Sequence, residues 1–192
     1  MQHENQVTDE QFFEQEVERG FTTHHWQALL DTQRFLADSL KIVGFNSVFE
    51  IGSGLGAFLI GAKAAGIDAR GMDCNPIARD FAISKGVDQW RYIPGDVRTF
   101  TIDVFVDCIL CVEVFEHCSD AELEPICRQL ASHCRWFYFT SIPYQHESDK
   151  VWGHINLKSK EEWILFFKKH GLTFVRDEKT IVEWGLLFRG TL

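Results

Sequence analysis

The segment that decides the fold is Val48-Phe-Glu-Ile-Gly52-Ser-Gly54-Leu-Gly56, which joins a short apolar stretch to an apolar helical pattern. Glycines at alternate positions let the backbone bend sharply and let a ligand approach it closely. The N-terminus of the following helix then offers free N–H groups. Dinucleotide-binding proteins carry the related pattern G-x-G-x-x-G, but here the third glycine comes one residue earlier and Ala57 takes its usual place. A tight turn between strand and helix, without a ligand, is the alternative interpretation.

Strand and helix patterns alternate from this loop onward. The last two strand patterns, 172–177 and 183–188, are separated by five residues, whereas a parallel crossover needs a dozen or more. That pair must therefore be antiparallel. The sequence predicts an α/β fold: a seven-stranded, mostly parallel sheet with an antiparallel last strand and helices on both faces. The other expected strands are 47–51, 67–72, 90–93, 104–111 and 136–141, and the expected helices are 55–65, 76–85, 120–133 and 159–170.

The N-terminal region has a helical pattern of its own. A short helix is expected over 9–19 and a longer one over 23–42, where apolar side chains recur at helical spacing. We therefore expect an N-terminal helical cap over 1–44 and, within the same globular unit, a domain over 45–192 that carries the glycine loop. The apolar face of the longer helix fits core packing and also fits a lid over a pocket. Its aromatic surface is a candidate contact for a homodimer.

Composition excludes several function classes. The 192 residues include 28 acidic and 19 basic side chains, and the net charge of −9 disfavours general binding to nucleic acid or to an anionic membrane. No stretch approaches the roughly 20 apolar residues of a membrane helix. The acidic N-terminus lacks the basic start and apolar run of a signal peptide, which predicts a cytoplasmic protein. The six cysteines are then expected to be buried free thiols, with Cys108 and Cys111 on opposite faces of one strand.

Two acidic residues follow predicted strands. Asp73 ends the second strand, where a carboxylate can accept hydrogen bonds from both hydroxyls of a ribose. Asp96 lies in a Gly95-Asp96-Val97 turn after the third strand, where a carboxylate can reach an adenine amine. Alone, each also fits an ordinary loop aspartate or a plain β-turn. The glycine loop makes the combination specific.

In order and spacing, these elements resemble the class I S-adenosylmethionine-dependent methyltransferases over roughly residues 45–190. The resemblance implies a Rossmann-like fold, S-adenosyl-L-methionine as cofactor and S-adenosyl-L-homocysteine as product. It implies that Asp73 holds the ribose hydroxyls and that Cys74 or Asn75 borders the adenine. The cofactor-binding residues that it implies are Glu50, Gly52, Ser53, Gly54, Gly56, Asp73, Cys74, Asp96, Val97, Cys111 and Val112.

The fourth strand ends in Cys111-Val-Glu113-Val-Phe-Glu116-His117, which resembles the E-V-x-E-H stretch of small-molecule methyltransferases such as the ubiquinone-pathway O-methyltransferases. In open α/β sheets, ligands bind at the carboxyl ends of the strands. An alcohol or phenol must lose a proton when it is methylated, and a histidine with a pKa near 6.5 suits that task. His117 is therefore the first catalytic candidate. The alternative is a structural role, in which His117 or Glu116 supports the loop under the cofactor.

The same stretch has a second interpretation as a metal site. Glu113, Glu116 and His117, with His154 further along the chain, resemble the divalent-ion site of small-RNA 3′-terminal 2′-O-methyltransferases. Two carboxylates and two imidazoles suit a six-coordinate ion that also grips adjacent hydroxyls of an acceptor. The acidic charge argues against an RNA acceptor and leaves a diol or catechol. We commit to no metal ligand from the sequence alone.

The loop after the fifth strand is expected to form the acceptor pocket. It carries Tyr144, His146 and Trp152 as expected substrate contacts and His154 as a second catalytic candidate. Such side chains suit a flat or sugar-like acceptor, while a surface loop with packed aromatics is the alternative. The sequence thus predicts a methyltransferase acting on an oxygen of a small molecule. Its rivals are a metal-assisted 2′-O-methyltransferase on RNA, a nicotinamide-dependent oxidoreductase, and a cofactor-binding protein without catalysis.

Overall fold

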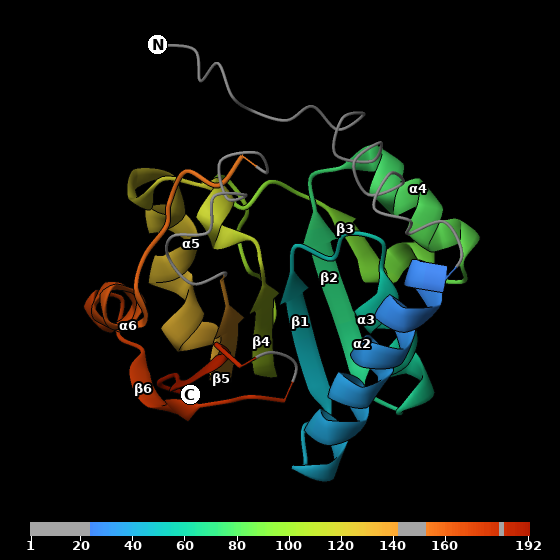
Figure 1. The fold of residues 1–192 in the computed structure, drawn as a ribbon, viewed down its shortest axis with the longest axis horizontal. Coiled ribbons are helices and arrows are strands. Elements are labelled where there is room, and N and C mark those ends of the chain that lie inside the picture. Colours follow the sequence, from blue (N-terminus) through green and yellow to red (C-terminus); the bar gives the residue numbers. More distant parts are fainter. Residues whose placement is uncertain (1–23, 142–152, 181–182) are drawn as a thin grey trace.

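The computed structural model describes residues 24–141, 153–180 and 183–192 of the chain (Figure 1). Seven strands form one sheet in the order β3-β2-β1-β4-β5-β7-β6. Neighbours among β1 to β5 pair in parallel, and β7 is antiparallel to both β5 and β6, which confirms the predicted sheet. The strands are β1 (Ser47–Ile51), β2 (Asp68–Asp73), β3 (Tyr92–Pro94), β4 (Val106–Val112), β5 (Cys134–Thr140), β6 (Thr173–Asp177) and β7 (Leu186–Arg189).

Helices cover both faces of the sheet, as the alternating pattern predicts (Figure 1). On one face lie α2 (His24–Ile42), α3 (Ala57–Ala64) and α4 (Pro76–Ser84), and on the other lie α5 (Asp120–His133) and α6 (Lys160–Lys169). Gly61 allows α2 and α3 to approach closely, because a Cβ there would lie 3.0 Å from the Cα of Arg34. Two short 3-10 helices, η1 (Gln89–Arg91) and η2 (Phe115–His117), precede β3 and follow β4.

The sheet has one hydrophobic core on each face, and successive side chains along a central strand point into opposite cores. In β5, Phe137 and Phe139 point into the core beneath α5 and α6, while Tyr138 points into the core beneath α2 and α3. Cys111 and Cys108 likewise belong to opposite cores, as predicted. Five of the six cysteines are buried free thiols. The expectation was wrong for Cys74, which is exposed because it lies in the loop after β2.

The predicted N-terminal cap over 1–44 stays a prediction, because residues 1–23 lie outside the described ranges. Its longer helix is present as α2, where Trp26 meets Phe81 of α4 edge to face, with ring centroids 5.3 Å apart. The predicted strand over 90–93 begins later, at Tyr92, because η1 occupies the residues before it. Within the described ranges, every helix is too short or too polar to cross a membrane.

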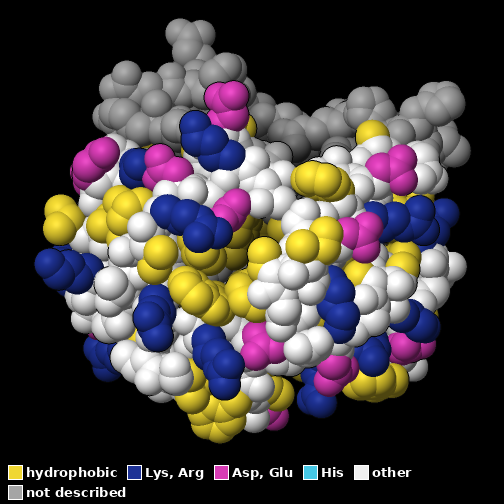
Figure 2. Space-filling model, turned by 90° about the horizontal axis from the view of Figure 1, so that it is seen from below, with side chains coloured by type: hydrophobic (Ala, Val, Ile, Leu, Met, Phe, Trp, Pro, Cys, Tyr) yellow, Lys and Arg dark blue, Asp and Glu magenta, His cyan; other side chains and the backbone are white. Residues whose placement is uncertain are grey.

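The two ends of the parallel strands differ in what they offer a ligand. A cavity of about 190 Å³ lies at the amino ends of β1 and β2. Figure 2 views the molecule from this side, where hydrophobic side chains line a hollow and both acidic and basic side chains lie around it. The residues predicted to bind the cofactor lie at the opposite edge, so this cavity is not their site. It is lined by Ser47, Val48, Phe49, Asp68, Arg70, Val104, Phe105 and Val106.

Candidate functional site

The glycine loop joins β1 to α3 and is held in place by main-chain hydrogen bonds. The N–H groups of Gly52 and Ser53 donate to the carbonyl oxygen of Met72 in β2, over 2.9 and 3.0 Å. Gly52 has a φ of 77°, and a Cβ at this position would lie 2.2 Å from Cγ2 of Val114. Gly54 has a φ of 45°, with open space where a side chain would stand. The loop can therefore pack against the residues after β4 and still expose its backbone to a ligand.

Asp73 is fastened to this loop at the carboxyl end of β2. Its Oδ2 accepts a hydrogen bond from the N–H of Gly54 over 2.8 Å, and its Oδ1 accepts one from the N–H of Asn75 over 2.9 Å. A carboxylate offers about four lone-pair positions. Each oxygen can therefore accept a second hydrogen bond, as adjacent hydroxyls of a ribose would require. The backbone on both sides sets the direction of the carboxylate before a ligand arrives.

Glu50 is a buried acid beside the loop, with only 6% of its surface exposed. Its Oε2 has no hydrogen-bond partner among the described residues. Burial raises the pKa of Glu50 to about 8, against the lowering effect of Ser53, and the negative charge of Asp73 raises it further. An orphaned carboxyl oxygen in this position is a site at which a cationic group would be stabilised.

The residues expected around the adenine differ in their exposure and in the contacts that they already make. Cys74 is exposed beside Asp73, while the side-chain oxygen of Asn75 caps α4 by accepting from the N–H groups of Ile77 and Ala78. Both carboxylate oxygens of Asp96 accept hydrogen bonds from the guanidinium of Arg98. This contact lowers the pKa of Asp96. Val97 is buried in the core beneath α5. If Asp96 contacts adenine as predicted, the adenine amine would have to share the carboxylate of Asp96 with the guanidinium of Arg98.

The end of β4 presents main chain rather than a reactive thiol. Cys111 is fully buried, and burial raises its pKa well above the ordinary value. Its contact with a cofactor would therefore be made through the backbone. Val112 is partly buried in the opposite core. The chain then turns sharply at Glu113, which has a φ of 54°.

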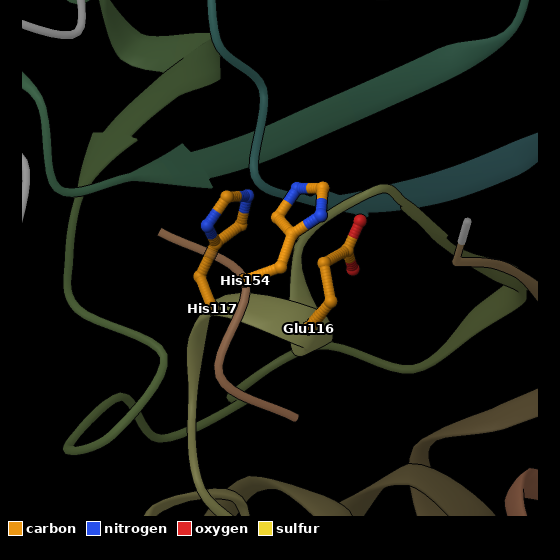
Figure 3. A group of neighbouring side chains, drawn as sticks. All are labelled: Glu116, His117 and His154. Carbon is orange, nitrogen blue, oxygen red and sulfur yellow. The ribbon is translucent and has the colours of Figure 1, made fainter. Parts of the chain in front are cut away.

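Beyond that turn, three ligand-type side chains converge. Glu116, His117 and His154 each offer an atom within 4.8 Å of the others, and their side chains point in the same direction (Figure 3). The rings of His117 and His154 have centroids 4.7 Å apart. The N–H groups of Ile155 and Asn156 both donate to the main-chain oxygen of Glu116, over 2.8 and 3.0 Å. These bonds hold His154 beside η2, although the two segments are distant in sequence.

The electrostatics of this cluster favour neutral groups. Glu116 is fully buried, and neither of its carboxyl oxygens has a hydrogen-bond partner within the described ranges. Burial and the charge of Glu113 raise its pKa well above the ordinary value. The edge of His117 is exposed, yet the protein atoms packed around it and neighbouring His154 lower its pKa to about 4. This value corrects the expectation of a pKa near 6.5, which holds for an unburied ring, and it makes His117 neutral at pH 7.

The structure brings together three of the four candidate metal ligands, Glu116, His117 and His154. The fourth, Glu113, lies outside this group. Oε1 of Glu113 accepts a hydrogen bond from the indole N–H of Trp184 over 2.9 Å. Sequence reasoning missed Trp184, because nothing local marks a residue of the β6–β7 loop as a neighbour of β4. It also missed Tyr92, whose hydroxyl donates to the carbonyl oxygen of Gly54 over 2.7 Å. The predicted substrate contacts Tyr144, His146 and Trp152 lie outside the described residues.

The comparison with known protein families gives one match at this site. A family model described as a methyltransferase domain matches residues 49–135, a little less than half of the chain. The matched segment contains the glycine loop, Asp73, the turn at Asp96 and the Glu116–His117 stretch. No curated protein sequence matches the chain significantly.

Solved structures with the same fold are numerous. DesVI of Streptomyces venezuelae is 12% identical, with a TM-score of 0.73 over 92% of this chain and 98% of its own. CalS10 of Micromonospora echinaspora, an amino pentose methyltransferase solved with S-adenosylmethionine, is 18% identical, with a TM-score of 0.67 over 97% and 99%. The mitomycin 7-O-methyltransferase MmcR is 19% identical, with a TM-score of 0.60 over 83% of this chain and 52% of its own. At these identities the likeness establishes the fold.

The fold is that of the class I S-adenosylmethionine-dependent methyltransferases, and residues 49–135 match a methyltransferase domain. The residues present fit that cofactor. Asp73 suits the ribose hydroxyls, open space at Gly54 admits a ligand against the backbone, and the orphaned oxygen of Glu50 suits a positively charged group. When bound, S-adenosylmethionine supplies an electrophilic methyl group on a sulfonium sulfur. The nicotinamide-dependent alternative is set aside by the family match.

Proposed function

We propose that the protein methylates an oxygen atom of a small-molecule acceptor. The observation that carries this proposal is the gathering of Glu116, His117 and His154 directly after β4, at the edge of the sheet where the cofactor-binding loop lies. A hydroxyl acceptor must be aligned with the methyl group and must give up its proton. Because His117 is neutral at pH 7, its ring keeps a nitrogen that can accept a hydrogen bond from such a hydroxyl.

The histidines are expected to matter for turnover and not for cofactor affinity. We predict that His117→Ala and His154→Ala each lower kcat roughly 100-fold, the lower range for loss of a general base, and change the dissociation constant of S-adenosylhomocysteine less than about threefold. The measurement is methyl transfer from isotope-labelled S-adenosylmethionine to a panel of catechols, phenols, sugars and primary amines, with products identified by mass spectrometry.

A matched control is His133→Ala. His133 ends α5 away from the site, and its Nδ1 contacts the carbonyl oxygen of Gln129. The His133→Ala variant should therefore leave kcat unchanged. Methylation confined to the amines would overturn oxygen transfer as the function. Full activity of both site variants on a hydroxyl acceptor would remove the histidines from the reaction.

A second candidate function is metal-assisted methylation of a diol, and the donor set favours it specifically. Glu116 has two buried oxygens without partners, and two imidazoles lie within reach of the same point. Two histidines and one carboxylate form a set that suits Mn²⁺, Fe²⁺, Co²⁺ or Zn²⁺ better than Mg²⁺. A bound ion would act as a Lewis acid that acidifies a neighbouring hydroxyl. Glu113 is not part of the group whose ligand atoms lie within 4.8 Å of one another, and its Oε1 accepts the hydrogen bond from Trp184.

Metal binding can be measured without turnover. We expect Mn²⁺ to bind protein loaded with S-adenosylhomocysteine in a one-to-one ratio by calorimetry. Glu116→Gln should weaken it at least about tenfold, because the amide keeps the shape of the side chain and removes the charged ligand. Glu161→Gln, at an exposed position in the first turn of α6, is the matched control. Binding that is the same in wild type and Glu116→Gln would contradict a metal at this cluster.

A further inference from the structure

Glu113 stands out by its backbone conformation. Within the described ranges it is the single residue other than glycine with a positive φ, at 54°. An L residue in this left-handed region carries a conformational cost, and such residues cluster where function requires them. Glu113 lies immediately after β4 and three residues before Glu116, at the edge of the proposed site. A glycine would occupy this backbone without strain, so the side chain itself needs an explanation.

The side chain of Glu113 holds an aromatic ring from a distant part of the chain. Its Oε1 accepts the hydrogen bond from the indole N–H of Trp184, which is 71 residues away in the sequence. The main-chain N–H of Glu113 donates to the carbonyl oxygen of Thr140 at the end of β5, over 3.1 Å. The strained turn is thus attached to the main chain of one neighbouring strand and to a side chain from the loop before β7.

The turn that carries Trp184 is itself tightly placed. A Cβ at Gly185 would lie 2.1 Å from the carbonyl oxygen of Glu178 and 2.7 Å from the hydroxyl of Tyr138. The N–H of Glu178 donates to the carbonyl oxygen of Gly185 over 2.7 Å. Trp184 nevertheless leaves 38% of its surface exposed, so its ring is not core packing. The chain therefore positions a large flat ring beside Glu113 and leaves part of it exposed.

We propose that Trp184 forms a wall of the acceptor site, that Glu113 is the residue that positions its ring, and that the site thereby selects an acceptor with a planar aromatic ring. This inference rests on the proposed function, since it concerns the same site. Aromatic rings stacked or edge-on against an indole are stabilised beyond what the area that they bury would give. A planar diol such as catechol should therefore be preferred over cyclohexane-1,2-diol, which has the same hydroxyl spacing and a puckered ring.

The first test follows Trp184 directly, without turnover. In a ¹⁵N-labelled protein loaded with S-adenosylhomocysteine, the indole N–H resonance absent from Trp184→Phe identifies Trp184. Addition of catechol should shift this resonance, and addition of cyclohexane-1,2-diol should shift it much less. In Glu113→Gly, which removes the carboxylate and relieves the backbone strain, the resonance should move because its hydrogen bond is lost. In Glu113→Gln it should stay close to its wild-type position, since the amide oxygen still accepts.

The second test separates positioning from folding. Trp184→Leu should raise KM for catechol about 5- to 10-fold with kcat changed less than about twofold, and Glu113→Gly should raise it about threefold. Glu113→Gln should restore the wild-type KM. The melting temperature of Glu113→Gly should stay within about 3 °C of wild type, because relief of strain offsets the added chain entropy.

The outcomes distinguish the inference from the function on which it rests. Methylation of catechol with no response of Trp184, and no change of KM in Trp184→Leu, would overturn the inference and leave the function standing. A clear response of Trp184 to catechol, with methylation of amines alone, would overturn the proposed function and leave the inference about Trp184 standing. Equal KM values for catechol and cyclohexane-1,2-diol would overturn the selection of a planar ring. No response and no methylation with either diol would reject the planar acceptor.

Discussion

Replacing Asp73 by alanine is expected to weaken the binding of S-adenosylhomocysteine roughly 100- to 1000-fold. The carboxylate would make two charge-assisted hydrogen bonds to the ribose hydroxyls, each worth about 1.5–3 kcal/mol. The N–H groups of Gly54 and Asn75 already fix both oxygens, so they need little reorganisation when the ligand binds. Calorimetric titration of wild type and Asp73→Ala measures the loss.

Two further variants make this result interpretable. Asp80→Ala removes a carboxylate from α4 whose side chain is 77% exposed, and it should leave the affinity unchanged. Asp73→Asn keeps one acceptor oxygen and should lie between wild type and Asp73→Ala. Thermal unfolding without ligand reports how far the glycine loop depends on Asp73 for its own stability. A dissociation constant for Asp73→Ala within about threefold of wild type would show that Asp73 does not bind the ribose.

The second large effect is expected from Glu50 and depends on pH. Burial raises the pKa of Glu50 from 4.5 to about 8. The folded state therefore holds a proton that the unfolded chain releases above pH 4.5. Stability from this group is complete below pH 4.5 and is lost as pH rises toward 8, by up to about 1.4 kcal/mol for each pH unit. In Glu50→Gln, which stays neutral, this loss should be absent.

The measurement is the free energy of unfolding by urea, without cofactor, between pH 5 and pH 8. Other groups titrate in the same range, so the quantity of interest is the difference between Glu50→Gln and wild type. From pH 5 to pH 8, the free energy of unfolding of Glu50→Gln should rise by roughly 3 kcal/mol relative to that of wild type. Glu161→Gln, at an exposed position in α6, should show a constant difference. Parallel curves for Glu50→Gln and wild type would mean that Glu50 is ionised in the folded protein.

The sheet topology could be predicted because it depends on local patterns. The connection before the last strand, predicted as five residues and formed by residues 178–185 in the structure, is too short for a parallel crossover, and β6 and β7 are indeed antiparallel. The opposite burial of Cys108 and Cys111 follows from the period of two along β4. The exposure of Cys74 could not be predicted from its neighbours, because the exposure of a loop residue depends on what packs over the loop.

The chemistry of the candidate site was predictable only in part. The sequence marked Glu116 and His117 by their types and their place after a buried strand, and it added His154 through the resemblance to a divalent-ion site. The pKa of His117 required the fold, since it depends on packed atoms and on a histidine from a distant segment. The commitment of Asp96 to Arg98 is a contact between near neighbours whose side-chain directions no motif specifies.

Two kinds of information thus meet in this protein. The sequence alone determined the order of strands and helices along the chain and the glycine loop, because these follow from periodicity and from residue types at fixed spacing. The class of cofactor was implied by the resemblance of these elements to class I methyltransferases. Only the tertiary structure decided that Trp184 bonds to Glu113 and that Glu113 lies outside the group formed by Glu116, His117 and His154. Such contacts arise when packing of the sheet and its loops brings together residues far apart in the chain, and short-range patterns carry no record of them.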